Sequence, residues 1–166
     1  ARGKQLPAAA VHLTKNLPVA SGIGGGSANA AAAMRGFLRL AGINGLDDEI
    51  MAAALSLGAD VPVCLKGVAC RMQGVGERIS PLDGFEPGAM ALVNPRVAVA
   101  TADIFKRLAL SPGERFAAPI SDVMDCATWR NDLTAAAVSL APAIAEVLSV
   151  LRQLPGVRHA AMSGSG

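Results

Sequence analysis

Four glycines occupy five consecutive positions, Gly22–Gly26, directly before Ser27 and an alanine-rich run. Glycine in a regular element costs roughly 0.5–1 kcal/mol relative to alanine, so this cluster indicates that the backbone itself is needed there. A glycine-rich turn that opens a helix exposes unpaired N–H groups at the positive end of the helix dipole, where a phosphate can approach without meeting a Cβ. The segment therefore predicts an anion-binding loop.

Two common phosphate-binding loops do not fit this segment. The residue before Ser27 is a glycine, whereas a G-x-x-x-x-G-K-[ST] loop requires a lysine there. The dinucleotide-binding pattern G-x-G-x-x-G fits poorly, because no long buried strand precedes it and no acidic residue follows at a suitable strand end. A tight turn that binds no ligand is the alternative interpretation, although four glycines exceed what such a turn requires.

Two further segments carry candidate functional groups. Asp60, in "LGADVP", comes two residues after an expected helix end and directly before an apolar run, so we expect its carboxylate to be partly desolvated. Such carboxylates are paired or poised for proton transfer, although an isolated aspartate is more often a cap or an ion-pair partner. The segment "MSGSG", Met162–Gly166, is a flexible turn by itself and a second backbone clamp if a phosphate lies nearby.

The helices expected to position these groups follow from caps and stop signals. Ser27 is a favourable N-cap for a helix that ends before Gly42, and Asp47 for a helix that stops at Gly58. Pro142 should restart or kink the last helical region. The expected helical ranges are 28–41, 48–57, 102–108 with Thr101 as cap, and 131–154. The buried face of the last range is expected to carry Leu140, Ile144, Leu148 and Leu151.

Short apolar or alternating segments predict strands over 11–14, 61–65, 68–72, 89–93 and 159–162. The second and third of these flank a turn at Lys66 and Gly67, so we expect them to pair as a hairpin. The turn-rich segment 73–88 is the expected domain boundary. It gives a first domain over residues 1–80 and a second over residues 81–166.

Composition restricts the class of protein. The 166 residues are 52% hydrophobic and 17% charged, which is typical of a globular chain. A net charge of +2 and 3% aromatic residues argue against a nucleic-acid partner, and no apolar run reaches the roughly 18 residues of a membrane span. Cys64, Cys70 and Cys126 lack metal-ligand spacing, so we expect reduced thiols and a cytoplasmic location. Because the chain starts without Met and stops inside a glycine-rich motif, we expect an internal piece of a longer protein.

A resemblance to a known family follows from the motifs. "LPVASGIGGGSANAAA", "SLGADVPVCL", "GVGERISPL", "VAVATADIF", "NDL" and "AAMSGSG" occur in the order and approximate spacing of the GHMP small-molecule kinases, which this chain resembles over nearly its whole length. The glycine loop alone indicates only the superfamily. "LGADVP" together with "GVGE" and "MSGSG" narrows the resemblance to the branch that phosphorylates a cytidyl-linked sugar alcohol in isoprenoid precursor synthesis.

The resemblance implies an α+β fold with two domains, incomplete at both ends: an N-terminal domain like ribosomal protein S5 domain 2 and a ferredoxin-like C-terminal domain, with the active site between them. It implies ATP and Mg²⁺ as cofactors, a small-molecule substrate, and neither a nucleic-acid nor a membrane partner. Asp60 would take the proton from the acceptor hydroxyl. The implied ATP-binding residues are Lys15, Pro18, Gly22, Gly24, Gly25, Gly26 and Ser27. The implied substrate-binding residues are Thr101, Phe105, Gly164 and Ser165, with Phe105 stacking on cytosine.

The chain also departs from the family pattern. We find no counterpart of the family's N-terminal strand, with its lysine that works with the aspartate and its residues that read the cytosine. Two alternatives stay open at the level of sequence. One is another GHMP kinase that acts on homoserine, mevalonate or a sugar, and the other is a nucleotide-binding module without catalysis.

Overall fold

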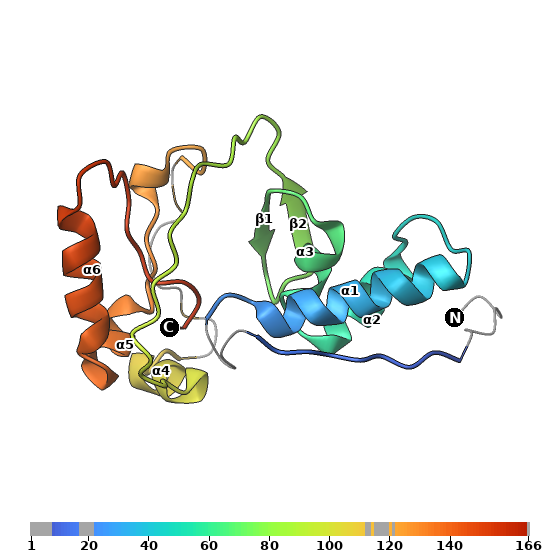
Figure 1. Ribbon diagram of the computed structural model, residues 1–166, viewed down its shortest axis with the longest axis horizontal. Helices are drawn as coiled ribbons and strands as arrows, with labels where there is room; N and C mark the ends of the chain where they lie inside the picture. Colours follow the sequence, from blue (N-terminus) through green and yellow to red (C-terminus); the bar gives the residue numbers. More distant parts are fainter. Residues whose placement is uncertain (1–7, 17–21, 112–113, 115–119, 121, 166) are drawn as a thin grey trace. The chain divides into compact units, whose positions relative to one another are not determined.

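The computed structural model describes residues 8–16, 22–111, 114, 120 and 122–165 (Figure 1). The chain divides into two compact units, the first formed by Ala1–Val19 with Gly24–Pro87 and the second by Ala20–Ile23 with Gly88–Gly166. Within the glycine loop, Gly22 and Ile23 therefore belong to the second unit, and Gly24–Gly26 belong to the first. Each unit has its own small hydrophobic core.

Three helices and one hairpin make up the first unit. Helices α1 (Gly25–Leu40), α2 (Asp48–Leu57) and α3 (Val61–Lys66) pack on one another. The strands β1 (Cys70–Gln73) and β2 (Arg78–Pro81) form an antiparallel hairpin, in which the first residue of β1 lies opposite the last residue of β2. Mixed helix and sheet content agrees with the expected α+β class.

The core of the first unit depends on small side chains. Ala31 of α1 and Ala54 of α2 are fully buried, and Val61 and Leu65 of α3 pack with them. An alanine at a helix contact lets the backbones approach closely, and burial of each neighbouring branched side chain stabilises the fold by about 1.5–3 kcal/mol. A guanidinium N–H of Arg35, on α1, donates to the carbonyl oxygen of Cys64 at 2.7 Å and so joins α1 to the end of α3.

The predicted boundaries of α2 are confirmed. The Asp47 carboxylate accepts a hydrogen bond from the N–H of Ile50 at 3.0 Å, and Gly58 ends the helix. Asp48 and Glu49 place negative charge in the first turn, where the helix dipole stabilises it. All of these signals are local, which explains why the sequence located the helix.

The second unit contains α4 (Thr101–Leu108), a 3-10 helix η1 (Cys126–Thr128), α5 (Thr134–Leu140) and α6 (Ala143–Gln153). Its buried core consists of Ile104, Ala136, Ala137, Ala141, Ile144 and Leu148. Val99 and Met162, from segments without regular structure, pack against this core. Pro142 is the N-cap of α6, so the predicted restart of the helix at this proline is confirmed.

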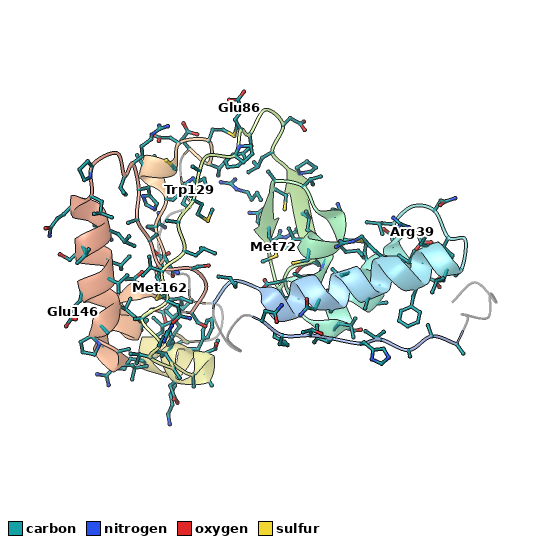
Figure 2. All side chains as sticks on the ribbon, viewed as in Figure 1. Arg39, Met72, Glu86, Trp129, Glu146 and Met162 are labelled. Atoms are coloured by element: carbon teal, nitrogen blue, oxygen red, sulfur yellow. The ribbon has the colours of Figure 1, made fainter. Side chains whose placement is uncertain are left out.

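Trp129, which is labelled in Figure 2, contacts Val123 and His159 in the second unit. Its indole N–H donates to the carbonyl oxygen of Val123 at 3.2 Å, and the ring meets His159 edge-on, with centroids 6.3 Å apart. Trp129 is half-buried, and an indole N–H removed from water generally needs such a partner. These contacts connect the segment before α5 to the segment after α6.

Several helix boundaries differ from the prediction. Helix α1 begins at Gly25 rather than at residue 28, and Gly24 takes the N-cap position in place of Ser27. Helix α4 begins at Thr101 itself, with Ala100 as N-cap. Helix α5 begins three residues later than expected, and Leu140 is 43% exposed because the restart at the proline turns it away from the core.

The predicted strand over residues 61–65 is wrong, because this segment forms α3. A short apolar run does not distinguish a buried strand from a buried helix, and proline is favourable in the first turn of a helix, where Pro62 lies. The helix buries Val61 and Leu65, four residues apart, on one face. The predicted hairpin is therefore wrong as well, and the segment 70–73 pairs instead with Arg78–Pro81.

Three other expected strands, over residues 11–14, 89–93 and 159–162, are not strands in the part of the chain that the structure describes. A strand requires a hydrogen-bonded neighbour, which alternation of side chains cannot supply. Met90 and Leu92 remain 80% and 65% exposed. None of the described helices combines the length and the apolar character that a membrane span requires.

The first unit offers a direct test of its alanine packing. Ala31→Leu adds a large side chain where the residue is fully buried against α2 and α3, so we expect the free energy of unfolding to fall by about 1–3 kcal/mol. Ala32→Leu makes the same change at an exposed position of α1 and should be nearly neutral. Urea denaturation followed by circular dichroism compares the two, and equal stabilities would contradict the close packing.

Candidate functional site

The glycine loop contains two kinds of glycine. Gly22 and Gly24 have φ of 69° and 67°, a left-handed conformation that favours glycine, so the turn itself requires them. Gly25 and Gly26 are the first residues of α1, and a Cβ at either would meet no described atom within 4 Å. Glycine inside a helix costs about 1 kcal/mol relative to alanine. The fold therefore accounts for the first pair of glycines and leaves the second pair unexplained.

The N-terminus of α1 is positive, and no capping hydrogen bond from a described side chain is found there. The first bond of the helix runs from the N–H of Ala28 to the carbonyl oxygen of Gly24 at 2.9 Å, so the preceding N–H groups have no partner within the helix. The first turn of the helix contains no acidic residue. A helix of 16 residues with this composition favours an anion at its N-terminus.

The second predicted clamp, near the end of the described chain, lies against the first residue of the glycine loop. The Ser163 hydroxyl donates to the carbonyl oxygen of Gly22 at 2.8 Å. Gly164 has a φ of 59°, and a Cβ there would lie 3.0 Å from the same oxygen. Within the second unit, the structure thus places Ser163 and Gly164 against Gly22.

Thr101 joins this cluster and does not serve as the predicted cap. Its hydroxyl lies 2.7 Å from the hydroxyl of Ser165, within hydrogen-bond distance. Thr101 is the first residue of α4 and therefore lies inside the helix, while Ala100 takes the N-cap position. Phe105, one turn further along α4, is 55% exposed, while its neighbour Ile104 fills the core. The aromatic ring is therefore available to a ligand.

Asp60 occupies the N-cap position of α3, but its side chain makes no capping hydrogen bond. The residue is exposed, so the expected partial desolvation is wrong: the burial at this end of α3 falls on the next two residues. Burial raises the pKa of the nearby Cys64 thiol, the negative charge of Asp60 raises it further, and Arg35 partly opposes both effects. Cys64 is therefore a neutral thiol at neutral pH and a poor nucleophile.

The "GVGE" motif forms the hairpin turn and packs behind Asp60, a role that sequence reasoning missed. Gly76 is buried, with a φ of 106°, and a Cβ there would collide with the carbonyl oxygen of Ala59. The Glu77 carboxylate accepts from the N–H of Val75 at 2.7 Å. Hydrogen bonds from the backbone of Glu77 and Val75 lower the pKa of this carboxyl, which is charged at neutral pH. The sequence signal for this role was Gly76 itself, a glycine in the turn-rich segment that was expected to be the domain boundary.

Two other predicted ATP-binding residues, Lys15 and Pro18, precede the glycine loop in the sequence. Lys15 is exposed and lies in a segment without regular structure, and Pro18 lies outside the described residues. Among the described residues, no three histidine, cysteine, aspartate or glutamate side chains gather into a metal site. Asn131, which the sequence predicted only as a helix start within the "NDL" motif, bonds to the carbonyl oxygens of Met162 and Gly164.

Comparison with known proteins identifies the class. Residues 1–68 match the family described as the GHMP kinases N terminal domain. The predicted resemblance to the GHMP kinases is confirmed over these residues.

The similarity to one enzyme extends over nearly the whole chain. The chain is 44% identical over 174 residues to the 4-diphosphocytidyl-2-C-methyl-D-erythritol kinase of Bradyrhizobium sp. strain BTAi1, covering 95% of this chain and 57% of that protein. It is 46% identical over 169 residues to the enzyme of the same name from Ruegeria pomeroyi, covering 95% of this chain and 58% of that protein. The chain thus spans somewhat more than half the length of these relatives.

A solved structure agrees with the sequence comparison. The crystal structure of a 4-(cytidine 5'-diphospho)-2C-methyl-D-erythritol kinase superimposes with a TM-score of 0.69 at 30% sequence identity. The match covers 92% of this chain and 57% of that chain, so both units described above take part in it. The narrower resemblance inferred from "LGADVP", "GVGE" and "MSGSG" is therefore also confirmed.

The cost of the collision between a Cβ at residue 76 and Ala59 can be measured separately from the strain of a positive φ. Gly76→Ala combines a positive φ with a collision against Ala59, whereas Gly84→Ala combines a positive φ of 75° with open space. Conformational strain of about 1–2 kcal/mol applies to both variants. We expect Gly76→Ala to lose at least about 1 kcal/mol more in the free energy of unfolding, because the turn must move away from the backbone of Ala59. Equal losses in urea denaturation would show that the contact with Ala59 contributes nothing.

Proposed function

We propose that this chain provides much of the site of an ATP-dependent kinase that phosphorylates the 2-hydroxyl of 4-diphosphocytidyl-2-C-methyl-D-erythritol, a step of non-mevalonate isoprenoid precursor synthesis. The observation that carries the proposal is the pair Gly25 and Gly26, which the fold does not require and which opens an uncapped helix N-terminus. A phosphate bound there explains both features. The identity of the acceptor alcohol in this proposal is taken from the names of the similar enzymes.

The proposed roles follow from the position of each group. The N–H groups of Gly25, Gly26 and Ser27 hold phosphate oxygens of ATP, and Lys15 adds positive charge near the nucleotide. Asp60 accepts the proton of the attacking hydroxyl, for which its exposed and uncapped carboxylate is suited. Phosphoryl transfer leaves the protein mainly the tasks of positioning and charge stabilisation, and these groups supply both.

Mg²⁺ fits this donor set as a companion of the nucleotide. It is usually bound through substrate phosphates with one or two protein oxygen ligands. The described residues form no three-ligand metal cluster, which agrees with a cation held mainly by phosphate, with the Ser27 hydroxyl or the Asp60 carboxylate as the protein oxygens. When bound, it would neutralise phosphate charge during transfer.

The acceptor side of the proposal rests on the second unit. Thr101, Gly164 and Ser165 form a polar cluster. The exposed ring of Phe105 offers a surface on which cytosine stacks, a contact typically worth about 1–3 kcal/mol. The proposal includes the finer fold assignment, with an N-terminal domain like ribosomal protein S5 domain 2, a ferredoxin-like C-terminal domain and a division near residue 80, and it includes a cytoplasmic enzyme.

The glycine loop provides the principal test. Gly25→Val places a branched side chain beside the N–H groups at the start of α1, so we expect the full-length protein to bind ATP at least about tenfold more weakly in calorimetry. Gly36→Val makes the same change in the middle of α1, where a Cβ also meets no described atom. Because valine has a higher helix propensity than glycine, neither variant should lose helicity. ATP affinity that is equal in both variants would refute the nucleotide site.

Asp60 provides a test of catalysis separate from binding. Asp60→Asn keeps the shape and removes the proton acceptor, so kcat should fall by about 10²–10⁴-fold while ATP affinity holds. Asp48→Asn, at an exposed carboxylate in the first turn of α2, is the matched control and should retain kcat. If Asp60→Asn keeps more than about a tenth of the wild-type kcat, Asp60 is no general base. A wild-type protein that binds ATP without phosphorylating the alcohol would instead indicate a nucleotide-binding module.

A further inference from the structure

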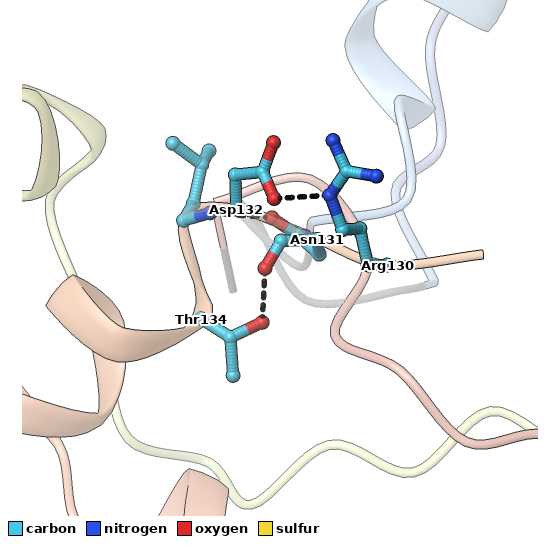
Figure 3. A network of polar contacts seen from close by, with 5 residues as sticks. Arg130, Asn131, Asp132 and Thr134 are labelled. Atoms are coloured by element: carbon cyan, nitrogen blue, oxygen red, sulfur yellow. Dashed lines mark hydrogen bonds and ion pairs between the residues drawn. The ribbon is translucent and has the colours of Figure 1, made fainter. Parts of the chain in front are cut away.

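Asn131 connects the start of α5 to the Ser163–Ser165 segment through its carboxamide group. The side-chain nitrogen donates to the carbonyl oxygen of Met162 at 2.8 Å and to that of Gly164 at 2.7 Å. The side-chain oxygen accepts from the N–H of Leu133 at 2.9 Å. Figure 3 shows Asn131 within the polar network that precedes α5. One side chain therefore holds two segments that are more than 30 residues apart in the sequence.

This set of bonds requires an amide side chain. A carboxamide carries two N–H donors and a carbonyl acceptor on one planar group, and at Asn131 both donors and the acceptor are used. An ionised aspartate has the same shape but donates nothing, and a serine hydroxyl carries a single donor. Two further contacts drawn in Figure 3 lie in the turn before α5, from Thr134 to the Asn131 carbonyl at 2.7 Å and from Arg130 to Asp132 at 2.8 Å.

The two bonds from Asn131 orient the backbone of the serine–glycine segment. In a trans peptide the C=O and the N–H point in opposite directions. With the carbonyls of Met162 and Gly164 directed to Asn131, the N–H groups of Ser163 and Ser165 point away from it. No described residue accepts a hydrogen bond from these N–H groups.

The same segment carries the contacts that assemble the candidate site of the second unit. The Ser163 hydroxyl bonds to the Gly22 carbonyl, and the Ser165 hydroxyl lies 2.7 Å from that of Thr101. Both hydroxyls belong to residues on either side of Gly164, whose carbonyl Asn131 holds. Without the bond from Asn131, the peptide group between Gly164 and Ser165 would be free to rotate. The hydroxyls of Ser163 and Ser165 would then lose their partners.

We propose that Asn131 is a positioning residue for phosphoryl transfer. It fixes the Ser163–Ser165 segment so that the backbone N–H groups and the Ser165 hydroxyl face the acceptor substrate. This inference rests on the proposed function, because it assigns the segment to the acceptor. Asn131 acts through Gly164 and Ser165 and touches no substrate itself.

A purely structural role for Asn131 is the competing interpretation, because asparagine before a helix commonly bonds an N–H two residues later. Asn131→Asp separates the two roles. The aspartate can still accept from Leu133, and its charge suits the start of a helix. It cannot donate to Met162 or Gly164, and it places negative charge against both carbonyl oxygens.

Thr134→Val is the matched control in the same turn. It removes the hydroxyl that donates to the Asn131 carbonyl and leaves the Asn131 amide intact. Thr134 is half-buried and valine has the same shape, so this variant reports the loss of stability from one broken bond in this turn. Any effect on activity that follows from lower stability alone should appear in both variants.

The kinetic experiment uses the full-length protein with ATP and 4-diphosphocytidyl-2-C-methyl-D-erythritol. For Asn131→Asp we expect kcat/KM for the alcohol to fall at least tenfold, with KM for ATP within twofold of wild type. For Thr134→Val we expect both constants to stay within twofold. A fall in kcat/KM that is equal in the two variants, or that follows their Tm values, would overturn the positioning role.

A second measurement does not require activity. Backbone ¹⁵N relaxation gives order parameters for the amides of Ser163, Gly164 and Ser165, where rigid backbone shows about 0.85 and flexible backbone less than about 0.6. We expect these values to decrease in Asn131→Asp and to hold in Thr134→Val. Unchanged values in Asn131→Asp overturn the inference whatever the activity of the wild type. Decreased values with unchanged kinetics in an active enzyme also overturn it, whereas an inactive wild type overturns the proposed function itself.

Discussion

The approach of the Gly164 backbone to the carbonyl oxygen of Gly22 is the contact on which the candidate site of the second unit depends. A Cβ at Gly164 would come within 3.0 Å of that oxygen, so only a glycine fits without displacement. The Ser163 hydroxyl bonds to the same oxygen across 141 positions of sequence. Around this contact the hydroxyl pair of Thr101 and Ser165 and the two bonds of Asn131 are arranged.

The first unit is built differently, because one compact group of helices carries both Asp60 and the N-terminus of α1. Fully buried alanines let α1, α2 and α3 approach closely. Arg35 then ties the end of α3 to α1, and the turn at Gly76 supports the residue before Asp60. Asp60 is exposed, and its position is fixed by its neighbours, because Ala59 lies against Gly76 and Val61 is buried.

Local signals made part of this structure predictable. The Asp47 cap, the stop at Gly58 and the restart at Pro142 each depend on residues within one turn, and the structure confirms them. Expected strands were wrong wherever a partner strand had to be supplied from elsewhere, because alternation does not specify a neighbour. The short run at 61–65 was misassigned because its burial pattern fits a helix as well as a strand.

The candidate site shows the same division between local and distant information. Its glycine-rich segments were visible in the sequence because clustered glycines are costly without a purpose. The supporting roles of Gly76 and Asn131 depend on partners 17 or more positions away, which composition and spacing do not reveal. The distinction between the glycines of the turn and those of the helix also required dihedral angles.

The position of Trp129 makes the tryptophan fluorescence of this chain a signal from one of its two units. It is the single tryptophan of the sequence, and its bond to the Val123 carbonyl and its contact with His159 both lie inside the second unit. Intrinsic tryptophan fluorescence therefore reports the environment of that unit, while far-ultraviolet circular dichroism sums the helices of both. Coincidence of the two signals during denaturation would indicate a single cooperative transition, and separation would indicate that the units unfold as independent bodies.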